Sequence, residues 1–294
     1  MLDKLLTLTR DPLLGVYVLR SKLSPVGLID RLSRLTTAAG IAKPRFLLSF
    51  DCDTDLDIEV VEAVHAELGR RGVRPVYAVP GELLERGREV YGRIASTGAE
   101  FMNHGWAEHT RLDRATGIYD SFLFYDRQSR AWVAEDIRRG HQSVSEIAGR
   151  APAGFRTPHF GSFQKHDELV FLHGELKKHG YRYSTSTVPF WGLRYGPVFD
   201  HLGIREVPVS GTFDRPLDIL DTWTHRCLGE HGGEAGYTRQ YESYRDYMTN
   251  NRPLLVNVYG DPSQVHDWPG FFDAVGLLAP WAVSSYAEAL DGTA

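Results

Sequence analysis

Cysteine is scarce in this chain of 294 residues and occurs only at positions 52 and 227. Two cysteines cannot provide the framework of several disulfides that stabilises small secreted domains, and they fit a reducing compartment. Long apolar runs are also missing: the N-terminal run Pro12–Leu19 lies between Asp11 and Arg20. It is far shorter than the ~20 residues that span a bilayer, and it does not read as a secretory signal. We therefore expect a cytoplasmic protein without a transmembrane segment.

An excess of positive charge is absent from the chain as a whole. It has 33 Lys and Arg against 38 Asp and Glu, a net charge of −5, which gives no reason to expect nucleic acid or an anionic membrane as partner. With 42% hydrophobic and 24% charged residues, the composition is that of an ordinary globular protein. This length would allow two small domains, but α/β barrels of this size commonly form one.

The first 43 residues differ in pattern from the rest. Leucines recur there at helical spacing, and Ser24 followed by Pro25 is typical of a helix start. We interpret residues 1–43 as a helical extension that packs on the main domain, the alternative being a partner-binding or membrane-surface element.

From Arg45 onward, short apolar runs alternate with amphipathic segments. Three of these segments, 57–72, 131–149 and 166–180, are typical helices, and each ends at a glycine that can terminate it. Eight runs could form strands: 46–50, 75–79, 100–103, 154–156, 181–183, 204–209, 254–259 and 281–283. The strand–helix order predicts a parallel, barrel-like α/β domain over residues 44–294. An open doubly wound sheet fits the alternation nearly as well, but no Gly-rich phosphate loop follows the first strand.

The first predicted strand leads into acids at every second position: Asp51, Asp53, Asp55 and Asp57. Like charges crowded at the end of a buried strand repel one another and lose hydration, which a bound cation would compensate. Side chains alternate along a strand, so Asp51 and Asp53 share a face, and one can bind a metal while the other acts as general base. We interpret Asp55 and Asp57 as caps or first-turn acids of the helix that begins near Ile58.

Ligand-type side chains follow several other predicted strands. They are His104, Glu108 and His109 after the third run, Arg156 and His159 after the fourth, and Asp261 and His266 after the seventh. In a parallel barrel the chemistry gathers at the carboxyl ends of the strands, so these side chains should meet at one rim. Acids, imidazoles and one arginine at one rim are typical of a metal-dependent hydrolase.

Three of these segments occur in a characteristic order: FDCD at 50–53, HGWAEH at 104–109 and FRTPHFG at 155–161. On these motifs the chain resembles the polysaccharide deacetylase family (the NodB homology domain, carbohydrate esterase family four) over roughly residues 45–290. The resemblance implies a distorted (β/α) barrel of about seven strands. It also implies a divalent metal, usually zinc, held by one Asp and two His.

The resemblance implies a role for each matching residue. Asp51 matches the general base, Asp53 and His104 match metal ligands, and Arg156 matches the residue that orients the base through a salt bridge. His159, which follows Pro158 in the motif, stands where the family often has Tyr, and its backbone N–H is expected at the oxyanion site. Candidates for stacking on a sugar, or simply for packing, are the aromatic residues Trp106, Trp223 and Tyr259.

Two positions depart from the family pattern. The second metal histidine usually lies four residues after the first, where this chain has Glu108, and His109 follows one residue later. A helical turn would put Glu108 beside His104, whereas a longer loop would let His109 bind; neutral imidazole suits zinc beside one carboxylate, which favours His109. At the position of the family's late acid histidine the chain has Asp261, with His266 a few residues beyond. Either, or neither, could protonate the leaving amine.

The residues themselves predict a metal-dependent hydrolase. The resemblance implies that it acts on an amide, most simply as an N-deacetylase of an N-acetylated sugar or polysaccharide precursor in polysaccharide biosynthesis. The alternatives are a catalytically impaired carbohydrate-binding relative and a hydrolase of a non-sugar amide. A retaining glycosidase would need two carboxylates from different strand ends ~5 Å apart, which fits Asp51 and Asp53 poorly. The expected partner is the saccharide, and a homo-oligomer is left open.

Overall fold

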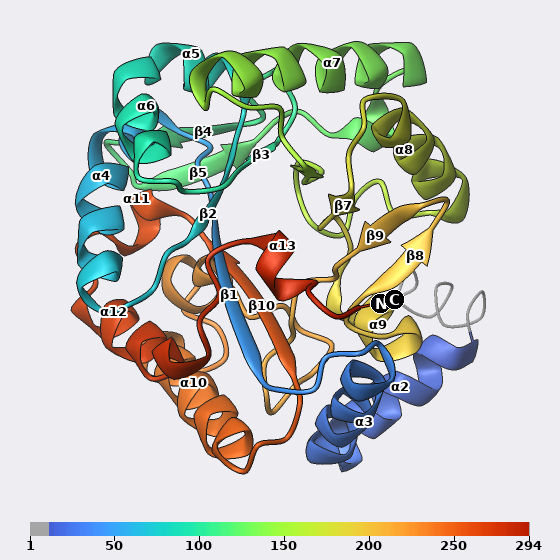
Figure 1. Ribbon diagram of the computed structural model, residues 1–294. Coiled ribbons are helices and arrows are strands. Elements are labelled where there is room, and N and C mark those ends of the chain that lie inside the picture. Colours follow the sequence, from blue (N-terminus) through green and yellow to red (C-terminus); the bar gives the residue numbers. More distant parts are fainter. Residues whose placement is uncertain (1–11, 294) are drawn as a thin grey trace.

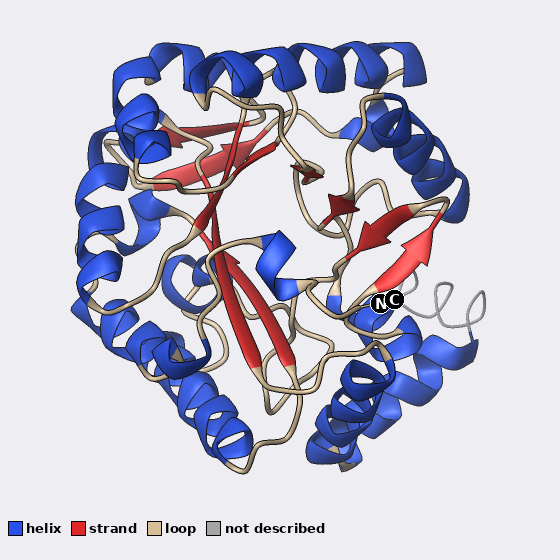
Figure 2. Cartoon of the chain, viewed as in Figure 1, coloured by secondary structure: helices blue, strands red, loops and turns tan. Residues whose placement is uncertain are grey.

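The computed structural model describes residues 12–293, and its centre is one curled sheet of eight strands surrounded by helices (Figures 1 and 2). The strand order is β10-β1-β2-β3-β6-β7-β9-β8. The strands are β1 Arg45–Asp51, β2 Val76–Val79, β3 Phe101–Asn103, β6 Gly154–Phe155, β7 Tyr183–Ser184, β8 Phe199–His201, β9 Ile204–Glu206 and β10 Leu255–Gly260. All neighbours pair in parallel except β8, which is antiparallel to β9. The predicted distorted α/β barrel is confirmed.

Helices fill the connections between the parallel strands. The three that the sequence predicts are present as α4, Asp55–Arg70, α7, Arg130–Ile147, and α8, His166–Lys178. The glycines at 72, 149 and 180 each lie two residues beyond the end of a helix. Their φ angles are 78°, 70° and 76°, in a conformation that L residues rarely adopt. The other helices after β1 are α5 Gly81–Arg86, α6 Arg88–Ser96, α9 Pro189–Tyr195, α10 Gly233–Thr249, α11 Pro262–Val265, α12 Pro269–Gly276 and α13 Tyr286–Ala289.

The prediction of a strand at 281–283 is wrong. The chain there leaves a short 3-10 turn, Ala279–Trp281, and makes a single parallel bridge between Ala282 and Phe46. Strand β2 pairs with β1 only from Ser49 onward, so the start of β1 has room for this one contact. Residues 284 and 285 already bend towards α13, which begins at Tyr286, so the ladder ends after this bridge.

Two hairpins contain strands that the sequence pattern did not identify, namely β4, Thr110–Asp113, β5, Ile118–Ser121, and β8. One comprises β4 and β5 and is separate from the main sheet. The other brings in β8 beside β9. Residues 111–121 carry many polar and exposed side chains, so an apolar run does not mark them. The first hairpin extends the loop between β3 and α7 over the carboxyl ends of the strands.

Asn257 on β10 joins the two ends of the curled sheet. Its backbone carbonyl accepts from the N–H of Ser210, which follows β9, at 2.7 Å. Its side-chain Nδ2 donates to the carbonyls of Val207 and Pro208, both at 3.1 Å. Its side-chain Oδ1 accepts from the hydroxyl of Tyr286 at 2.9 Å. Tyr286 begins α13, which lies within the ring of strands in Figure 1. One buried amide therefore closes the barrel.

Two helices, α2, Pro12–Leu23, and α3, Pro25–Ala38, lie where the helical extension is expected, while residues 1–11 of that extension are outside the described part. The buried side chains of Tyr17, Leu28 and Ile29 belong to the same hydrophobic core as β1 and β10. Within the described residues, no helix is long and apolar enough to cross a membrane.

Replacing the barrel-closing amide should destabilise the fold. In Asn257→Ala, two buried carbonyls and one tyrosine hydroxyl lose their partner, so the free energy of unfolding should fall by about 2–4 kcal/mol. Urea denaturation followed by circular dichroism measures this change. The control is Asn250→Ala, whose amide makes one exposed hydrogen bond and whose loss should stay within about 0.5 kcal/mol. Equal stability of the two variants would contradict the role of Asn257.

Candidate metal centre

Three side chains from different strand ends converge at the carboxyl edge of the sheet. Asp53 follows β1, His104 follows β3, and His109 immediately precedes β4. One ligand-type atom of each lies within 4.8 Å of the others. The Nε2 atoms of His109 and His104 are 3.0 Å and 3.5 Å from Asp53 Oδ1. Both imidazoles are buried, so the group forms a compact, partly closed site.

The backbone orients both imidazoles toward this point. Nδ1 of His104 is 2.8 Å from the carbonyl oxygen of Arg156, and Nδ1 of His109 is 3.4 Å from that of Ala107. A protonated Nδ1 donates to a carbonyl and leaves Nε2 as the free ligand atom, the arrangement usual in metal sites. Asp53 Oδ1 and the two Nε2 atoms are buried without a hydrogen-bond partner. Such groups are costly unless a ligand satisfies them, and one carboxylate with two imidazoles fits a divalent cation.

The irregular path of residues 104–109 decides which side chain joins this group. Gly105 takes φ of 82°, which prevents a helical turn, and the chain then runs extended into β4. His109 consequently points inward, while Glu108 forms an ion pair with Arg86 outside the cluster. Asp136 on α7 holds the loop in place, because its Oδ1 accepts from the N–H of Ala107 at 2.9 Å.

Burial and mutual charge set the protonation of these ligands. Burial alone would raise the pKa of Asp53, but the imidazoles of His109 and His104 outweigh it and hold the pKa well below the usual range. Burial lowers the pKa of His104 to about 3. Burial alone would lower the pKa of His109, but the carboxylate of Asp53 outweighs this effect and raises the pKa. An ionised Asp53 and a neutral His104 are the forms in which a metal is bound.

A second carboxylate, Asp51, lies beside the three ligands and pairs with Arg156. Its Oδ1 accepts from the fully buried guanidinium, and its Oδ2 is 3.9 Å from Nε2 of His104. Arg156 is held in turn by Ser49 Oγ at 2.7 Å and the hydroxyl of Tyr286 at 3.2 Å. Burial raises the pKa of Asp51 to about 6, although Arg156 opposes the shift. Asp51 can therefore exchange a proton near neutral pH.

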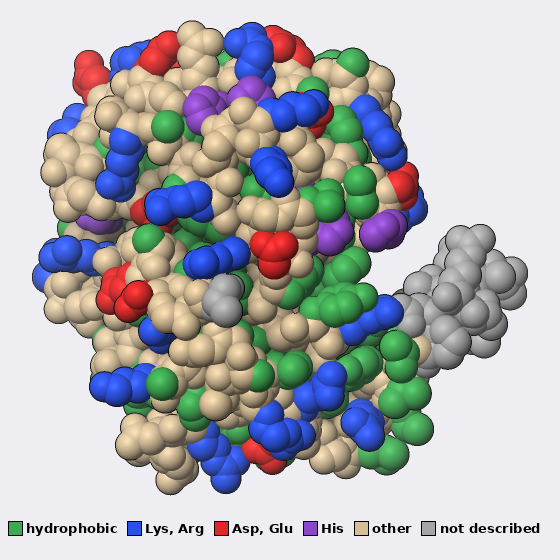
Figure 3. All heavy atoms as spheres, turned by 45° about the vertical axis from the view of Figure 1, so that its right-hand side comes forward, with side chains coloured by type: hydrophobic (Ala, Val, Ile, Leu, Met, Phe, Trp, Pro, Cys, Tyr) green, Lys and Arg blue, Asp and Glu red, His purple; other side chains and the backbone are tan. Residues whose placement is uncertain are grey.

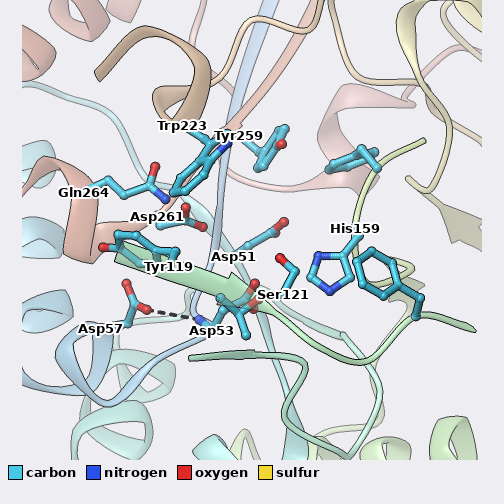
Figure 4. Close-up of a pocket in the computed structure, with 13 residues that line it drawn as sticks. Asp51, Asp53, Asp57, Tyr119, Ser121, His159, Trp223, Tyr259, Asp261 and Gln264 are labelled. Atoms are coloured by element: carbon cyan, nitrogen blue, oxygen red, sulfur yellow. Dashed lines mark hydrogen bonds between the residues drawn. The ribbon is translucent and has the colours of Figure 1, made fainter. Parts of the chain in front are cut away.

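The cluster opens into a cavity of about 270 Å³ (Figure 4). Figure 4 shows Trp223 and Tyr259 on one side of the carboxylates of Asp51 and Asp261, and Ser121 on the other. Burial, followed by the charge of Asp53, raises the pKa of Asp261 well above its ordinary value. The residues around the cavity are Asp51, Asp53, Asp57, Thr110, Tyr119, Ser121, Phe124, His159, Phe160, Trp223, Tyr259, Asp261 and Gln264. Among the described residues, four aspartates and no Lys or Arg line it, so the cavity is acidic.

Besides Glu108, three sequence-derived candidates neither belong to the metal-ligand group and its Asp51–Arg156 pair nor line this cavity. His266 follows the short helix α11 and lies in a separate surface groove between α4 and α12, with Nδ1 3.0 Å from the carbonyl of Ser263. Trp106 lies under the guanidinium of Arg139 on the outer side of the barrel. Pro158 is buried beside the cavity but does not line it. His159, in contrast, lines it with its ring 5.0 Å from that of His109.

A network of hydrogen bonds that was not predicted from the sequence connects the loops around the cavity. Asp55 and Asp57 are the expected first-turn acids of α4, but Asp57 is fully buried. Its Oδ2 accepts from the N–H groups of Asp53 and Thr54, and its Oδ1 from the N–H of Ser263 at 2.7 Å. Ser263 Oγ accepts from the hydroxyl of Tyr119 in the hairpin at 2.8 Å. Thr54 and Asp57 form a capping box, a local signal that could have indicated the first contacts, but no local signal indicates the one to Ser263.

The comparisons with known proteins agree with this geometry. The model of the family described as polysaccharide deacetylase matches residues 41–184, which include Asp51, Asp53, both imidazoles and Arg156. The chain belongs to the polysaccharide deacetylase family. No curated protein sequence matches it. The family comprises metal-dependent hydrolases of carbon–nitrogen bonds other than peptide bonds, so the predicted enzyme class is confirmed.

Solved structures show the same fold at low sequence identity. A putative polysaccharide deacetylase from Mycobacterium smegmatis is 17% identical, with a TM-score of 0.59 over 86% of this chain and 91% of that one. A probable polysaccharide deacetylase from Pseudomonas aeruginosa PAO1 is 10% identical, with a TM-score of 0.62 over 85% and 90%. A pseudoenzyme of carbohydrate esterase family four from Bacillus anthracis is 12% identical, with a TM-score of 0.52 over 86% and 67%. These likenesses establish the fold alone, and one of the three chains that share it is a pseudoenzyme.

Metal content distinguishes the two ligand sets that the sequence left open. Asp53→Ala and His109→Ala should lower the affinity for Zn²⁺ by more than about 100-fold, because each removes a buried ligand atom. Glu108→Ala is the matched control and should bind as the wild type does, since its carboxylate pairs with Arg86. Competition with a chromogenic chelator measures the affinities. Loss of metal in Glu108→Ala with retention in His109→Ala would reverse the assignment.

Proposed function

We propose that this polysaccharide deacetylase removes the acetyl group from an N-acetylated sugar or polysaccharide precursor, as a step of polysaccharide biosynthesis. The proposal rests on one observation above all: the carboxylate of Asp51, fixed by Arg156, lies against the Asp53–His104–His109 group inside a cavity. This combination supplies a proton acceptor beside a metal site, which amide hydrolysis by water requires.

We propose zinc as the cation, held by Asp53, His104 and His109. When bound, it supplies Lewis acidity, which lowers the pKa of a water molecule from ~15.7 toward ~7 and polarises a carbonyl oxygen. Asp51 accepts the proton of the attacking water, and the guanidinium of Arg156 keeps its carboxylate oriented. His159, with φ of 59° at the cavity wall, has the backbone N–H that we assign to the developing oxyanion.

Asp261 is the residue that we propose as proton donor to the leaving nitrogen. Its carboxyl lines the cavity, and burial together with the charge of Asp53 raises its pKa well above the ordinary value, which favours the protonated form that a proton donor needs. His266 lies in a different groove. The reaction then consumes one water and yields acetate and an amine. The aromatic rings of Trp223, Tyr259 and Tyr119 around the cavity suit the apolar face of a sugar.

The role of Asp51 can be tested against metal binding. Asp51→Asn should lower kcat by about 100- to 10,000-fold, because the general base is lost, while Zn²⁺ stays bound. Acetate release from N-acetylated oligosaccharides and metal analysis of the same sample measure both. Because Arg156 is fully buried, its charge is left less compensated and stability should fall by about 3 kcal/mol, which a thermal melt controls. Full activity of Asp51→Asn would refute the assigned base. Wild type that binds metal but hydrolyses no N-acetyl sugar would favour the non-catalytic alternative.

A comparison of two leaving groups tests the role of Asp261. Asp261→Asn should lower the hydrolysis of an N-acetylated sugar by about 100-fold or more, because the amine leaves only when protonated. It should leave the hydrolysis of 4-nitrophenyl acetate nearly unchanged, because nitrophenolate leaves without a proton. His266→Ala is the control and should resemble the wild type on both substrates. An equal loss on both substrates, or a selective loss on the amide in His266→Ala, would contradict the assignment.

A further inference from the structure

The outer side of α2 exposes a row of large aliphatic side chains. Val16, Leu19 and Leu23 are 49%, 58% and 75% exposed, and Val26, at the start of α3, is 48% exposed. Spacings of three and four residues put the first three on one side of the helix. We call these four residues the α2 face. Figure 3 shows hydrophobic side chains gathered at the lower right of the molecule, where α2 and α3 lie in Figure 1.

The opposite side of α2 is already packed against the barrel. Tyr17 is buried, and its hydroxyl donates to the carbonyl of Leu193 on α9 at 3.1 Å. The helix is thus apolar on the side that packs and on the side that faces outward. Exposed aliphatic side chains that gather on one face of a protein often mark a contact surface for a partner or a membrane. The α2 face is therefore expected to have a partner outside the barrel.

The extension that carries this face is basic in sequence, in contrast to the acidic chain as a whole. Residues 1–43 hold seven Lys and Arg against three Asp, a net charge of +4, whereas the full chain carries −5. The remaining residues, 44–294, therefore carry −9. Arg20, Lys22 and Arg34 are exposed, and their side chains make no ion pair or hydrogen bond within residues 12–293. Their charge is available to an external anion.

This pairing of aliphatic and basic side chains selects one class of partner. A second copy of the chain docked through the same face would bring two basic sets together, which like charges oppose. An anionic lipid bilayer offers acyl chains for the leucines and valines and phosphates for the basic residues. At 12 residues, about 18 Å, α2 is too short to cross a bilayer and suits a position along its surface.

We propose that the α2 face docks this protein on the surface of an anionic lipid bilayer. The aliphatic side chains enter the boundary between head groups and acyl chains, and Arg20, Lys22 and Arg34 contact the phosphates. The net charge of the whole chain does not indicate this basic surface, because the negative charge of the barrel exceeds the positive charge of the extension. The proposal concerns binding only and does not depend on the chemistry assigned to the cavity.

Sedimentation of the full-length protein with lipid vesicles tests the proposal. Vesicles of phosphatidylcholine with about one third phosphatidylglycerol should bind the wild type, and pure phosphatidylcholine vesicles much less. In about 1 M salt, where the Debye length is about 3 Å, binding to the mixed vesicles should weaken strongly. Leu19→Ser with Leu23→Ser should lower the partition coefficient by about tenfold per leucine, and Arg20→Gln with Lys22→Gln by about fivefold per residue.

The control variant is Val170→Ser, because Val170 on α8 is an exposed aliphatic residue, 39%, away from the α2 face. It should bind vesicles as the wild type does, and circular dichroism should show every variant folded. No binding of the wild type to the anionic vesicles, or equal binding by the Leu19→Ser, Leu23→Ser variant, would overturn the proposal. So would a dimer in solution that this variant dissociates, since the α2 face would then be an interface between copies.

Discussion

The organisation of the site depends on one buried ion pair, between Arg156 and Asp51. The guanidinium contacts the carboxylate at the end of β1, the hydroxyl of Ser49 on the same strand and the hydroxyl of Tyr286 on α13. The backbone carbonyl of Arg156 accepts from the imidazole of His104. A fully buried cation of this kind is stable only with its partners in place. Arg156 thus fixes both the proposed base and the direction of one metal ligand.

A second buried carboxylate organises the loops rather than the chemistry. Asp57 accepts from the backbone beside Asp53 and from that of Ser263, and Ser263 continues the connection to Tyr119. Three segments distant in sequence therefore meet around the cavity through one side chain. The four acids at and after the end of β1 have three roles. Asp51 and Asp53 face the centre, Asp57 joins the loops, and Asp55 pairs with Arg86 at the surface.

Much of this arrangement could be predicted from the sequence, because the period-two placement of Asp51 and Asp53 and the glycine-terminated helices are local signals. The choice between Glu108 and His109 was not local, since it depends on the loop that Gly105 turns and Asp136 holds. The same applies to His266 and Trp106, whose distance from the cavity depends on how α11 and α7 pack. The composition did not indicate the α2 face as a binding surface, because the net charge of the whole chain is the sum of a basic extension and a more strongly acidic barrel.

The central claim is that a divalent cation compensates the negative charge at the end of β1. Anomalous diffraction at the zinc edge, from crystals of the protein loaded with Zn²⁺, tests it most directly. We expect one strong peak per chain, in contact with the carboxylate of Asp53 and the Nε2 atoms of His104 and His109, with Asp51 adjacent and still paired with Arg156. A loaded crystal without a peak among these three side chains, or with the peak on Glu108, would contradict the account.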